Sequence, residues 1–200
     1  MRSPSPDGPT GPGLHVLMGV CASSAAIAAP QAVVFLRAHP LVDEVTVMMT
    51  PSAASLVGTQ ALSVANQAEP IVGWGHHPLH VDIGASIDVA VVAPTTATSL
   101  ARLAIGDAAN VLLATLLATP APVHLYPSMN STMWAKPAVQ RNVAQLTADG
   151  LTVVSPAEGV RIGAPGSNTT EVGSAHLSIS ALHSILTDLS NRRATRSPDR

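Results

Sequence analysis

The eight-residue sequence PSMNSTMW brings together side chains that could bind a flat ring or a polar substrate group. The side-chain amide of Asn130 can both donate and accept hydrogen bonds. Met129, Met133 and Trp134 could form an apolar wall against a ring or a sulfur-containing substrate. Pro127 lacks a backbone donor and follows an apolar run, which is typical of the end of a strand. Taken alone, the sequence is equally compatible with a loop whose Met and Trp side chains fill a gap in the core.

Histidines gather in the segment that precedes the third apolar run of the chain. His76, His77 and His80 lie close together, and Asp82 is the nearest carboxylate. Ordinary zinc sites need three or four ligands, and the sequence offers no second cluster of ligands. We therefore expect no metal. A single histidine that carries a proton is the simpler interpretation, because the unperturbed pKa of imidazole lies near neutrality.

Two turns rich in hydroxyl groups follow the first two apolar runs. Gly19 lies near the end of the first run, and Ser23 and Ser24 follow it, while Thr50 and Ser52 follow the second run. A strand that passes through such a turn into a helix presents free backbone N–H groups, and these favour an anion such as phosphate. No GxGxxG motif or Walker lysine accompanies the turns. The alternative is an ordinary strand-to-helix turn in which serine caps the helix.

Composition limits the class of protein. The chain has 200 residues, which suits one domain, and 46% of them are apolar but only 11% charged, against about 25% in typical proteins. So little charge suggests that copies of the chain cover part of its surface. A net charge of −2 without a basic block argues against nucleic acid. The single cysteine, Cys21, excludes an internal disulfide and a multi-cysteine zinc site.

Nothing in the sequence indicates a membrane. The first 13 residues lack the apolar core of a signal peptide, and the longest apolar run, 111–118, is too short to span a bilayer. We therefore expect a cytoplasmic protein with no membrane partner.

Apolar runs alternate with helical patterns along the body of the chain, and the connections between them are short. This alternation predicts the α/β class, with a doubly wound parallel sheet in a single domain. The expected strands are 14–20, 45–49, 89–93, 121–126 and 151–154, and the expected helices are 27–38, 53–65, 100–108, 111–118, 135–149 and 175–189.

The remaining segments are expected to be irregular. Residues 1–13 and 191–200 have the composition of disordered tails, and 66–82 shows no regular pattern. Residues 159–174 are polar and rich in glycine, which indicates a surface loop or a lid over a site. The domain itself is expected to cover 14–190.

Three segments, taken in order, resemble those of one family, the homo-oligomeric flavin-containing cysteine decarboxylases. They are GVCASSAA at 19–26, HVDI at 80–83 followed by APTTATS at 93–99, and PSMNSTMW. That family includes phosphopantothenoylcysteine decarboxylase and the peptidyl-cysteine decarboxylases of lanthipeptide and linaridin biosynthesis. The resemblance covers roughly Leu14 to Pro156.

The resemblance implies a Rossmann-like, flavodoxin-like subunit that forms trimers, sometimes stacked into dodecamers, with FMN near the subunit interface. It implies that His80 and Asn130 are catalytic, and that the substrate is contacted by Pro127, Met129, Asn130, Met133 and Trp134. The residues implied to bind the cofactor are Gly19, Ser23, Ser24, Thr50, Ser52, Ala93, Pro94, Thr95, Thr96, Thr98 and Met129. Of these, Ser23 and residues 50–52 would hold the phosphate, and 94–98 would line the isoalloxazine ring.

The implied reaction is an oxidative decarboxylation. Oxidation of a C-terminal cysteine by the flavin would give a thioaldehyde, which accepts the electrons of the departing carboxylate, and an enethiol would result. His80 would act as the base and Asn130 would hold the carboxylate. The reduced flavin would return its electrons to dioxygen.

Two departures from the family pattern bear on the product. Thr98 stands where the family usually has Asn or Asp, which weakens the polar contact with the flavin that the pattern assigns there. The segment 159–174, expected to form a clamp over the substrate, lacks the cysteine that reduces the enethiol in the coenzyme A branch. We therefore expect the enethiol as product and the C-terminus of a precursor peptide as partner, as in antibiotic biosynthesis.

Three alternatives remain open at this point. One is phosphopantothenoylcysteine decarboxylation, and another is a flavin prenyltransferase of similar fold, whose basic phosphate-binding residues are not evident here. The third is a non-catalytic regulatory subunit that uses the fold to bind a protein partner.

Overall fold

The structure is a computed structural model of the chain. It describes residues 13–75, 78–160, 170–174 and 177–196. No helix in these described ranges is long and apolar enough to cross a membrane.

Five parallel strands form the central sheet, in the order β2-β1-β3-β4-β5. The chain begins in the interior of the sheet, moves outward to β2 and then crosses back over β1 to β3, so the direction of winding reverses between β1 and β3. This strand order is that of a doubly wound, flavodoxin-like fold, and it confirms the predicted class. The strands are β1 (Leu14–Val20), β2 (Val42–Met49), β3 (Val89–Thr95), β4 (Val123–Pro127) and β5 (Thr152–Val153).

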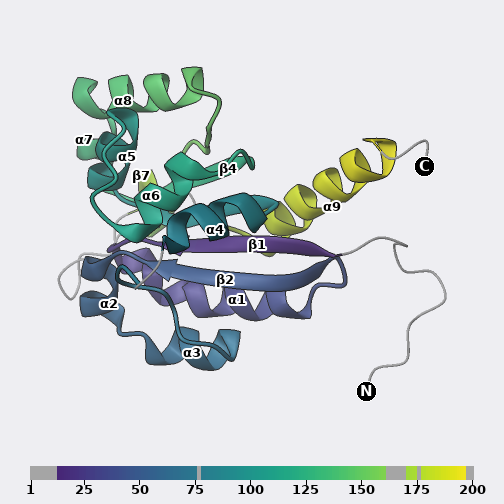
Figure 1. Cartoon of the computed structure of the whole chain (residues 1–200). Coiled ribbons are helices and arrows are strands. Elements are labelled where there is room, and N and C mark those ends of the chain that lie inside the picture. The colour runs from purple at the N-terminus through teal and green to yellow at the C-terminus, as the bar shows by residue number, and fades with distance from the viewer. Residues whose placement is uncertain (1–12, 76–77, 161–169, 175–176, 197–200) are drawn as a thin grey trace.

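Helices cover both faces of the sheet (Figure 1). On one face, leucines of α1, α3 and α9 pack against the strands, and on the other face the same is true of α5, α6 and α8, with α4 beside α6. This two-sided cover explains why the strands are continuous apolar runs. The helices are α1 (Ala29–Ala38), α3 (Gln60–Asn66), α4 (Leu79–Ser86), α5 (Ala97–Ala104), α6 (Val111–Ala118), α8 (Pro137–Ala148) and α9 (Ile179–Arg196).

Close packing between α6 and the sheet depends on a glycine in β1. All seven residues of β3 are buried, as are Val111 to Leu116 of α6. A Cβ atom on Gly19 would lie 3.0 Å from Leu112 Cδ1 and 3.0 Å from Val92 Cγ2. The absence of a side chain at Gly19 therefore lets α6 lie close against β1 and β3.

Polar side chains cap the helices that follow the first four strands. Each cap accepts a hydrogen bond from a backbone N–H in the first turn of its helix, which would otherwise lack a partner. The capping residues are Ser23 for the 3-10 helix η1 (Ser24–Ala28), Thr50 for α2 (Pro51–Val57), Thr96 for α5 and Asn130 for α7 (Ser131–Trp134), and Asn110 likewise caps α6.

Several predicted boundaries differ from those observed. The helix predicted at 53–65 is two helices, α2 and α3, separated at Gly58, whose φ of 70° is a conformation that glycine adopts readily. The segment 66–82 is not wholly irregular, because Ile71 forms a bridge with Met48 and α4 starts at Leu79. The helix predicted at 100–108 runs from Ala97 to Ala104, directly after its cap.

The C-terminal part also has more regular structure than the sequence suggested. The ends of the predicted clamp segment pair as antiparallel strands β6 (Ala157–Val160) and β7 (Thr170–Ser174), and residues 161–169 lie outside the described ranges. Helix α9 continues to Arg196, into the stretch predicted to be a tail. Arg193 on this extension forms an ion pair with Asp88, which anchors it to the sheet. The prediction for residues 1–13 falls almost wholly outside the described ranges.

A pair of histidines joins α1 to α9. Leu41 N–H donates to His39 Nδ1 at 3.2 Å, so His39 Nε2 carries the proton and donates to His183 Nδ1 at 3.0 Å. Burial, together with the neighbouring His183, lowers the pKa of His39. The folded protein therefore binds this proton less readily than the unfolded chain.

We expect acid to destabilise the protein through His39. A histidine whose pKa is lowered by folding costs stability as the pH falls below about 6.5, its ordinary pKa. The melting temperature should fall more steeply between pH 7.5 and 5 in the wild-type protein than in His39→Gln, which cannot take up the proton. Equal pH dependence in the two proteins, measured by circular dichroism, would contradict this assignment.

Candidate functional site

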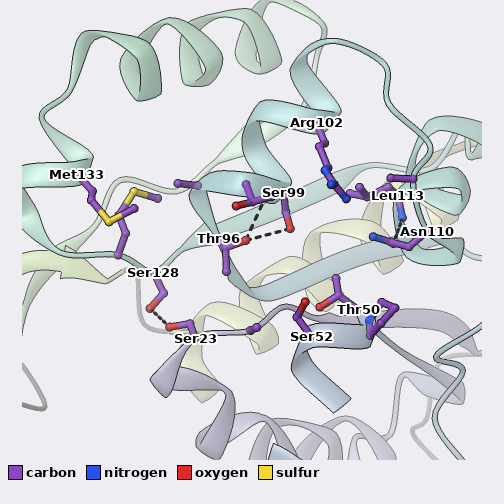
Figure 2. A pocket seen from close by; sticks show the side chains of 16 residues that line it. Ser23, Thr50, Ser52, Thr96, Ser99, Arg102, Asn110, Leu113, Ser128 and Met133 are labelled. Carbon is purple, nitrogen blue, oxygen red and sulfur yellow. Dashed lines mark hydrogen bonds between the residues drawn. The ribbon is translucent and has the colours of Figure 1, made fainter. Parts of the chain in front are cut away.

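A crevice of about 470 Å³ opens at the carboxyl edge of the sheet. It lies where the turns after β1, β2, β3 and β4 converge, on either side of the point where the direction of winding reverses. Ligands of open α/β sheets bind at this point. Figure 2 shows the side chains that surround it. The lining residues are Ala22, Ser23, Thr50, Pro51, Ser52, Thr96, Ala97, Thr98, Ser99, Arg102, Ala109, Asn110, Leu113, Ser128, Met129 and Met133.

One end of the crevice joins the turns after β1 and β4. The Oγ atoms of Ser23 and Ser128 lie 2.6 Å apart and share a hydrogen bond. Next to them, the thioethers of Met129 and Met133 form an apolar wall, and Met133 is 42% exposed. Figure 2 shows Met133 on the same side as Ser23 and Ser128. This end is suited to a flat apolar group with polar atoms on its edge.

The floor is formed by the turn after β3. Thr96 Oγ1 lies 3.1 Å from Ser99 Oγ, and Ser99 Oγ in turn donates to Cys21 Sγ at 3.2 Å. Burial raises the pKa of the Cys21 thiol, and this side chain does not line the crevice. The one thiol of the chain is therefore a packed part of the floor, protonated and shielded from the ligand.

The other end holds the most polar groups. Ser52 and Thr50 rise from the start of α2, Arg102 reaches in from α5, and Asn110 stands at the start of α6 (Figure 2). Thr50 Oγ1 is already used as a cap for Ala53 N–H, at 3.2 Å. Ser52 Oγ and the guanidinium of Arg102 therefore provide the chief donors for a ligand at this end.

The sequence of the chain matches the Flavoprotein family over residues 7–183. The chain belongs to the Flavoprotein family. It is 31% identical over 149 residues to mersacidin decarboxylase of Bacillus sp. (strain HIL-Y85/54728), and the match covers 72% of this chain and 74% of that protein. The predicted membership of the flavin-containing cysteine decarboxylases is thereby confirmed.

Two solved structures share this fold. The FMN-dependent cysteine decarboxylase SpaF is 37% identical, with a TM-score of 0.75 over 90% of this chain and 98% of that one. MrsD from Bacillus sp. HIL-Y85/54728 is 26% identical, with a TM-score of 0.70 over 90% and 97% of the two chains. Over 123 residues the chain is also 41% identical to the bifunctional coenzyme A biosynthesis protein CoaBC of Mycolicibacterium smegmatis, of which it spans 30%.

The side chains that line the crevice are of the types that bind a flavin mononucleotide. Hydroxyl groups and a guanidinium suit a phosphate and a ribityl chain, and methionines suit the face of a flavin ring. Of the predicted cofactor and substrate residues, the structure brings Ser23, Thr50, Ser52, Thr96, Thr98, Met129 and Met133 together around this space.

Other predicted residues lie outside the lining. Gly19, Ala93 and Thr95 are buried strand residues, and Pro94 O accepts a hydrogen bond from Cys21 N–H at 3.0 Å, which fixes the turn beneath the crevice. Ser24 starts helix η1, and Trp134 ends α7. Pro127 is the buried last residue of β4. Their predicted contacts with the flavin or the substrate remain proposals.

Asn130 follows the lining residue Met129 in the sequence and caps α7. Its Oδ1 accepts the backbone N–H of Met133 at 2.8 Å. The carboxamide oxygen is thus occupied, and the NH₂ group is left to donate. Donation is what a substrate carboxylate requires, so the cap and the predicted role of Asn130 are compatible.

His80 does not line the crevice of its own chain. It lies in the first turn of α4, where the ring of Trp74 meets it edge-on with centroids 5.5 Å apart. Its Nδ1 atom is buried and has no hydrogen-bond partner among the described residues. His76 and His77 lie outside those residues, so the expectation of no metal at this histidine cluster stays a prediction.

Sequence reasoning missed Arg102, Asn110, Ser99 and Ser128 as parts of the crevice. A signal for one of them was present, because Arg102 stands four residues after Thr98 and so shares its helix face. Asn110 could be read only as a helix cap, and its place beside the turn after β2 depends on the packing of α6.

The structure gives Gly19 a packing role that can be separated from cofactor binding. We expect Gly19→Ala to lower the free energy of unfolding by about 1–3 kcal/mol, because its Cβ would crowd Leu112 and Val92. The affinity of the folded protein for FMN should stay unchanged. Urea denaturation and flavin fluorescence titration measure the two effects.

Gly73→Ala is the matched control, because a Cβ there meets no atom within 4 Å. A Gly19→Ala protein with normal stability but weakened FMN binding would show that Gly19 contacts the cofactor instead.

Proposed function

We propose that this protein is an FMN-dependent peptidyl-cysteine decarboxylase that converts the C-terminal cysteine of a ribosomally made precursor peptide to an enethiol. The observation that carries the proposal is the likeness to SpaF, which extends over 90% of this chain and 98% of that FMN-dependent cysteine decarboxylase. The protein is an enzyme, at once oxidoreductase and lyase, and FMN is its cofactor. We place the reaction in the cytoplasm, as a step of lanthipeptide-type antibiotic biosynthesis.

The chemistry explains why a flavin is needed. An aliphatic carboxylate does not readily lose CO₂, because the electron pair left on the α-carbon has no acceptor. When bound, FMN supplies the two-electron oxidation of the cysteine Cβ–SH unit to a thioaldehyde. The new C=S group then accepts the electron pair as the bond between Cα and the carboxylate breaks. CO₂ leaves, a Cα=Cβ double bond forms, and the sulfur becomes an enethiolate.

We assign two roles to side chains of this chain. His80 takes the thiol proton of the substrate cysteine during its oxidation, which is the role that the family resemblance implies for this histidine. The NH₂ group of Asn130 donates to the substrate carboxylate and holds it beside the wall formed by Met129 and Met133. Trp74 restricts the orientation of the His80 ring through its edge-on contact.

We further propose that His80 acts in the crevice of a neighbouring copy, within a homotrimer that could stack into a dodecamer. In its own chain His80 is not part of the crevice lining. Large apolar side chains are exposed as well, among them Ile27 at 72%, Val64 at 70% and Ile105 at 79%. Burial of such side chains between copies would both stabilise an oligomer and complete the active site.

A second candidate is phosphopantothenoylcysteine decarboxylation, favoured by the 41% identity to CoaBC over 123 residues. The segment 159–174 of this chain contains no cysteine, so it cannot supply the thiol that reduces the enethiol in that pathway. We therefore rank the peptide substrate first.

Mass spectrometry tests the proposed reaction. We expect the FMN-loaded protein to remove about 46 Da from a peptide ending in cysteine, which is the mass of CO₂ and two hydrogens. A matched peptide ending in serine should stay unchanged, because it has no thiol to oxidise. A yellow, FMN-loaded protein that changes no cysteine-ended peptide would overturn the proposal, and turnover of phosphopantothenoylcysteine instead would favour the second candidate.

His80→Ala should lower the rate of peptide decarboxylation by about 100-fold or more, the usual range for the loss of a catalytic base. The flavin absorbance near ~450 nm should be retained, because the flavin crevice does not include His80. Val81→Ala, a change at the exposed neighbouring position, is the control. Full activity of His80→Ala would favour a non-catalytic role for this segment.

Mixed oligomers test the shared site. We expect co-expressed His80→Ala and Asn130→Ala chains to regain about a quarter of the wild-type activity at most. The reason is that random assembly of a closed ring pairs an intact His80 with an intact Asn130 in that fraction of the sites. If His80 served the crevice of its own chain, every site would lack one of the two groups, and the mixture would be as inactive as either variant.

A further inference from the structure

The methionines of the described chain differ sharply in exposure. Met18, Met48 and Met49 are each 0% exposed within the sheet. Met129 is partly buried and packs against the apolar core. Met133 is 42% exposed and lines the crevice, where Figure 2 shows its side chain. Among the described methionines, Met133 is therefore the one most open to a solute that enters the crevice.

The single thiol of the chain is shielded from the same solutes. Cys21 is 1% exposed, and its Sγ accepts a hydrogen bond from Ser99 Oγ at 3.2 Å. Burial raises the pKa of this thiol, so the thiol stays protonated near neutral pH. The thiolate is the form of cysteine that oxidants attack most readily. An oxidant in the crevice would therefore react at a thioether and leave Cys21 unchanged.

The proposed reaction itself produces an oxidant. Each turnover leaves two electrons on the flavin, and these must be removed before a second peptide can be oxidised. Dioxygen that takes up these two electrons and two protons becomes hydrogen peroxide. This peroxide forms in the crevice whose wall contains Met133. The wall has to be open to a peptide between turnovers, so it is also open to a molecule as small as peroxide.

We propose that Met133 is a modification site, which the hydrogen peroxide of turnover oxidises to methionine sulfoxide, and that this oxidation reversibly lowers the activity. The thioether sulfur attacks one oxygen of the peroxide, the O–O bond breaks, an S=O bond forms, and the second oxygen leaves as water. The sulfur loses two electrons and the peroxide gains them. This inference rests on the proposed function, because the flavin reaction is the source of the peroxide.

Oxidation changes the wall that faces the substrate. A thioether is apolar, whereas a sulfoxide carries a polar oxygen that accepts hydrogen bonds. The backbone N–H of Met133 donates to Asn130 Oδ1 at 2.8 Å, and residues three apart are neighbours on a helix face. The sulfoxide oxygen would thus compete for the NH₂ group of Asn130, which we assign to the substrate carboxylate. We therefore expect the oxidised protein to bind the peptide more weakly.

Mass spectrometry of the enzyme during turnover tests the proposal. With a cysteine-ended peptide in air, Met133 should gain about 16 Da, the mass of one oxygen atom. The buried Met18, Met48 and Met49 should stay unchanged, and fragment spectra assign each methionine. Catalase, which destroys hydrogen peroxide, should prevent the gain. A serine-ended peptide should give no gain either, because it passes no electrons to the flavin.

The activity should follow the oxidation state of Met133. After peroxide treatment, the rate at low peptide concentration should fall to about a tenth of its initial value, because a polar group now faces an apolar ligand. A methionine sulfoxide reductase should restore the rate.

Two variants locate the effect. Met133→Leu keeps an apolar side chain of similar volume but has no sulfur to oxidise, so peroxide should leave its rate as it was before treatment. Met49→Leu removes a buried methionine and is the matched control, which should lose activity as the wild type does. Each rate is compared with that of the same protein before treatment, because Met133 belongs to the wall and its replacement alters the starting rate. Circular dichroism melts show whether each variant is folded.

The outcomes separate this inference from the proposed function. Formation of the enethiol without a gain of mass at Met133 would overturn the inference and leave the decarboxylase assignment intact. An equal loss of activity in Met133→Leu and the wild type would also overturn it, since another group would then be the one inactivated. An FMN-loaded protein that forms no enethiol from any cysteine-ended peptide would overturn the proposed function, and the inference with it.

Discussion

The carboxyl ends of parallel strands must all meet at one edge of a sheet, and the site of this protein depends on that constraint. Four turns, after β1, β2, β3 and β4, converge there although they are far apart in the sequence. The reversal of winding between β1 and β3 opens the space between them. The core serves this arrangement, because burial on both faces keeps the strands in fixed register and so keeps the turns in fixed positions.

The polar residues in the turns have two functions at once. Each is needed locally, because the first backbone N–H groups of a helix require a partner. Thr50, Thr96 and Asn110 meet this need and at the same time line the crevice. A cap uses only one side of a hydroxyl or carboxamide, so the remaining donors can face a ligand. This explains how a crevice with so many polar groups is compatible with a stable fold.

Much of the fold could be predicted from the sequence, because the strands are short apolar runs and turns with small or hydroxyl residues separate them. The sequence could not distinguish a packing role for Gly19 from a contact with the cofactor, because a glycine just before a turn that suits phosphate is compatible with both. The break at Gly58 and the start of α4 at Leu79 were missed because the segments around them have weak periodicity. The motifs located the crevice through Ser23, Thr96 and Met129. They missed Arg102, whose place in the lining depends on the packing of α5.

We assign the active site to two chains: the crevice of one chain binds FMN, and His80 comes from a neighbouring copy. The most direct test is a crystal structure of the protein grown with FMN. We predict that the flavin lies in the crevice at the carboxyl edge of the sheet, with its ring against Met129 and Met133. His80 of a neighbouring copy should face that ring. Flavin bound elsewhere on the chain, or a crevice that His80 of no copy approaches, would contradict the account.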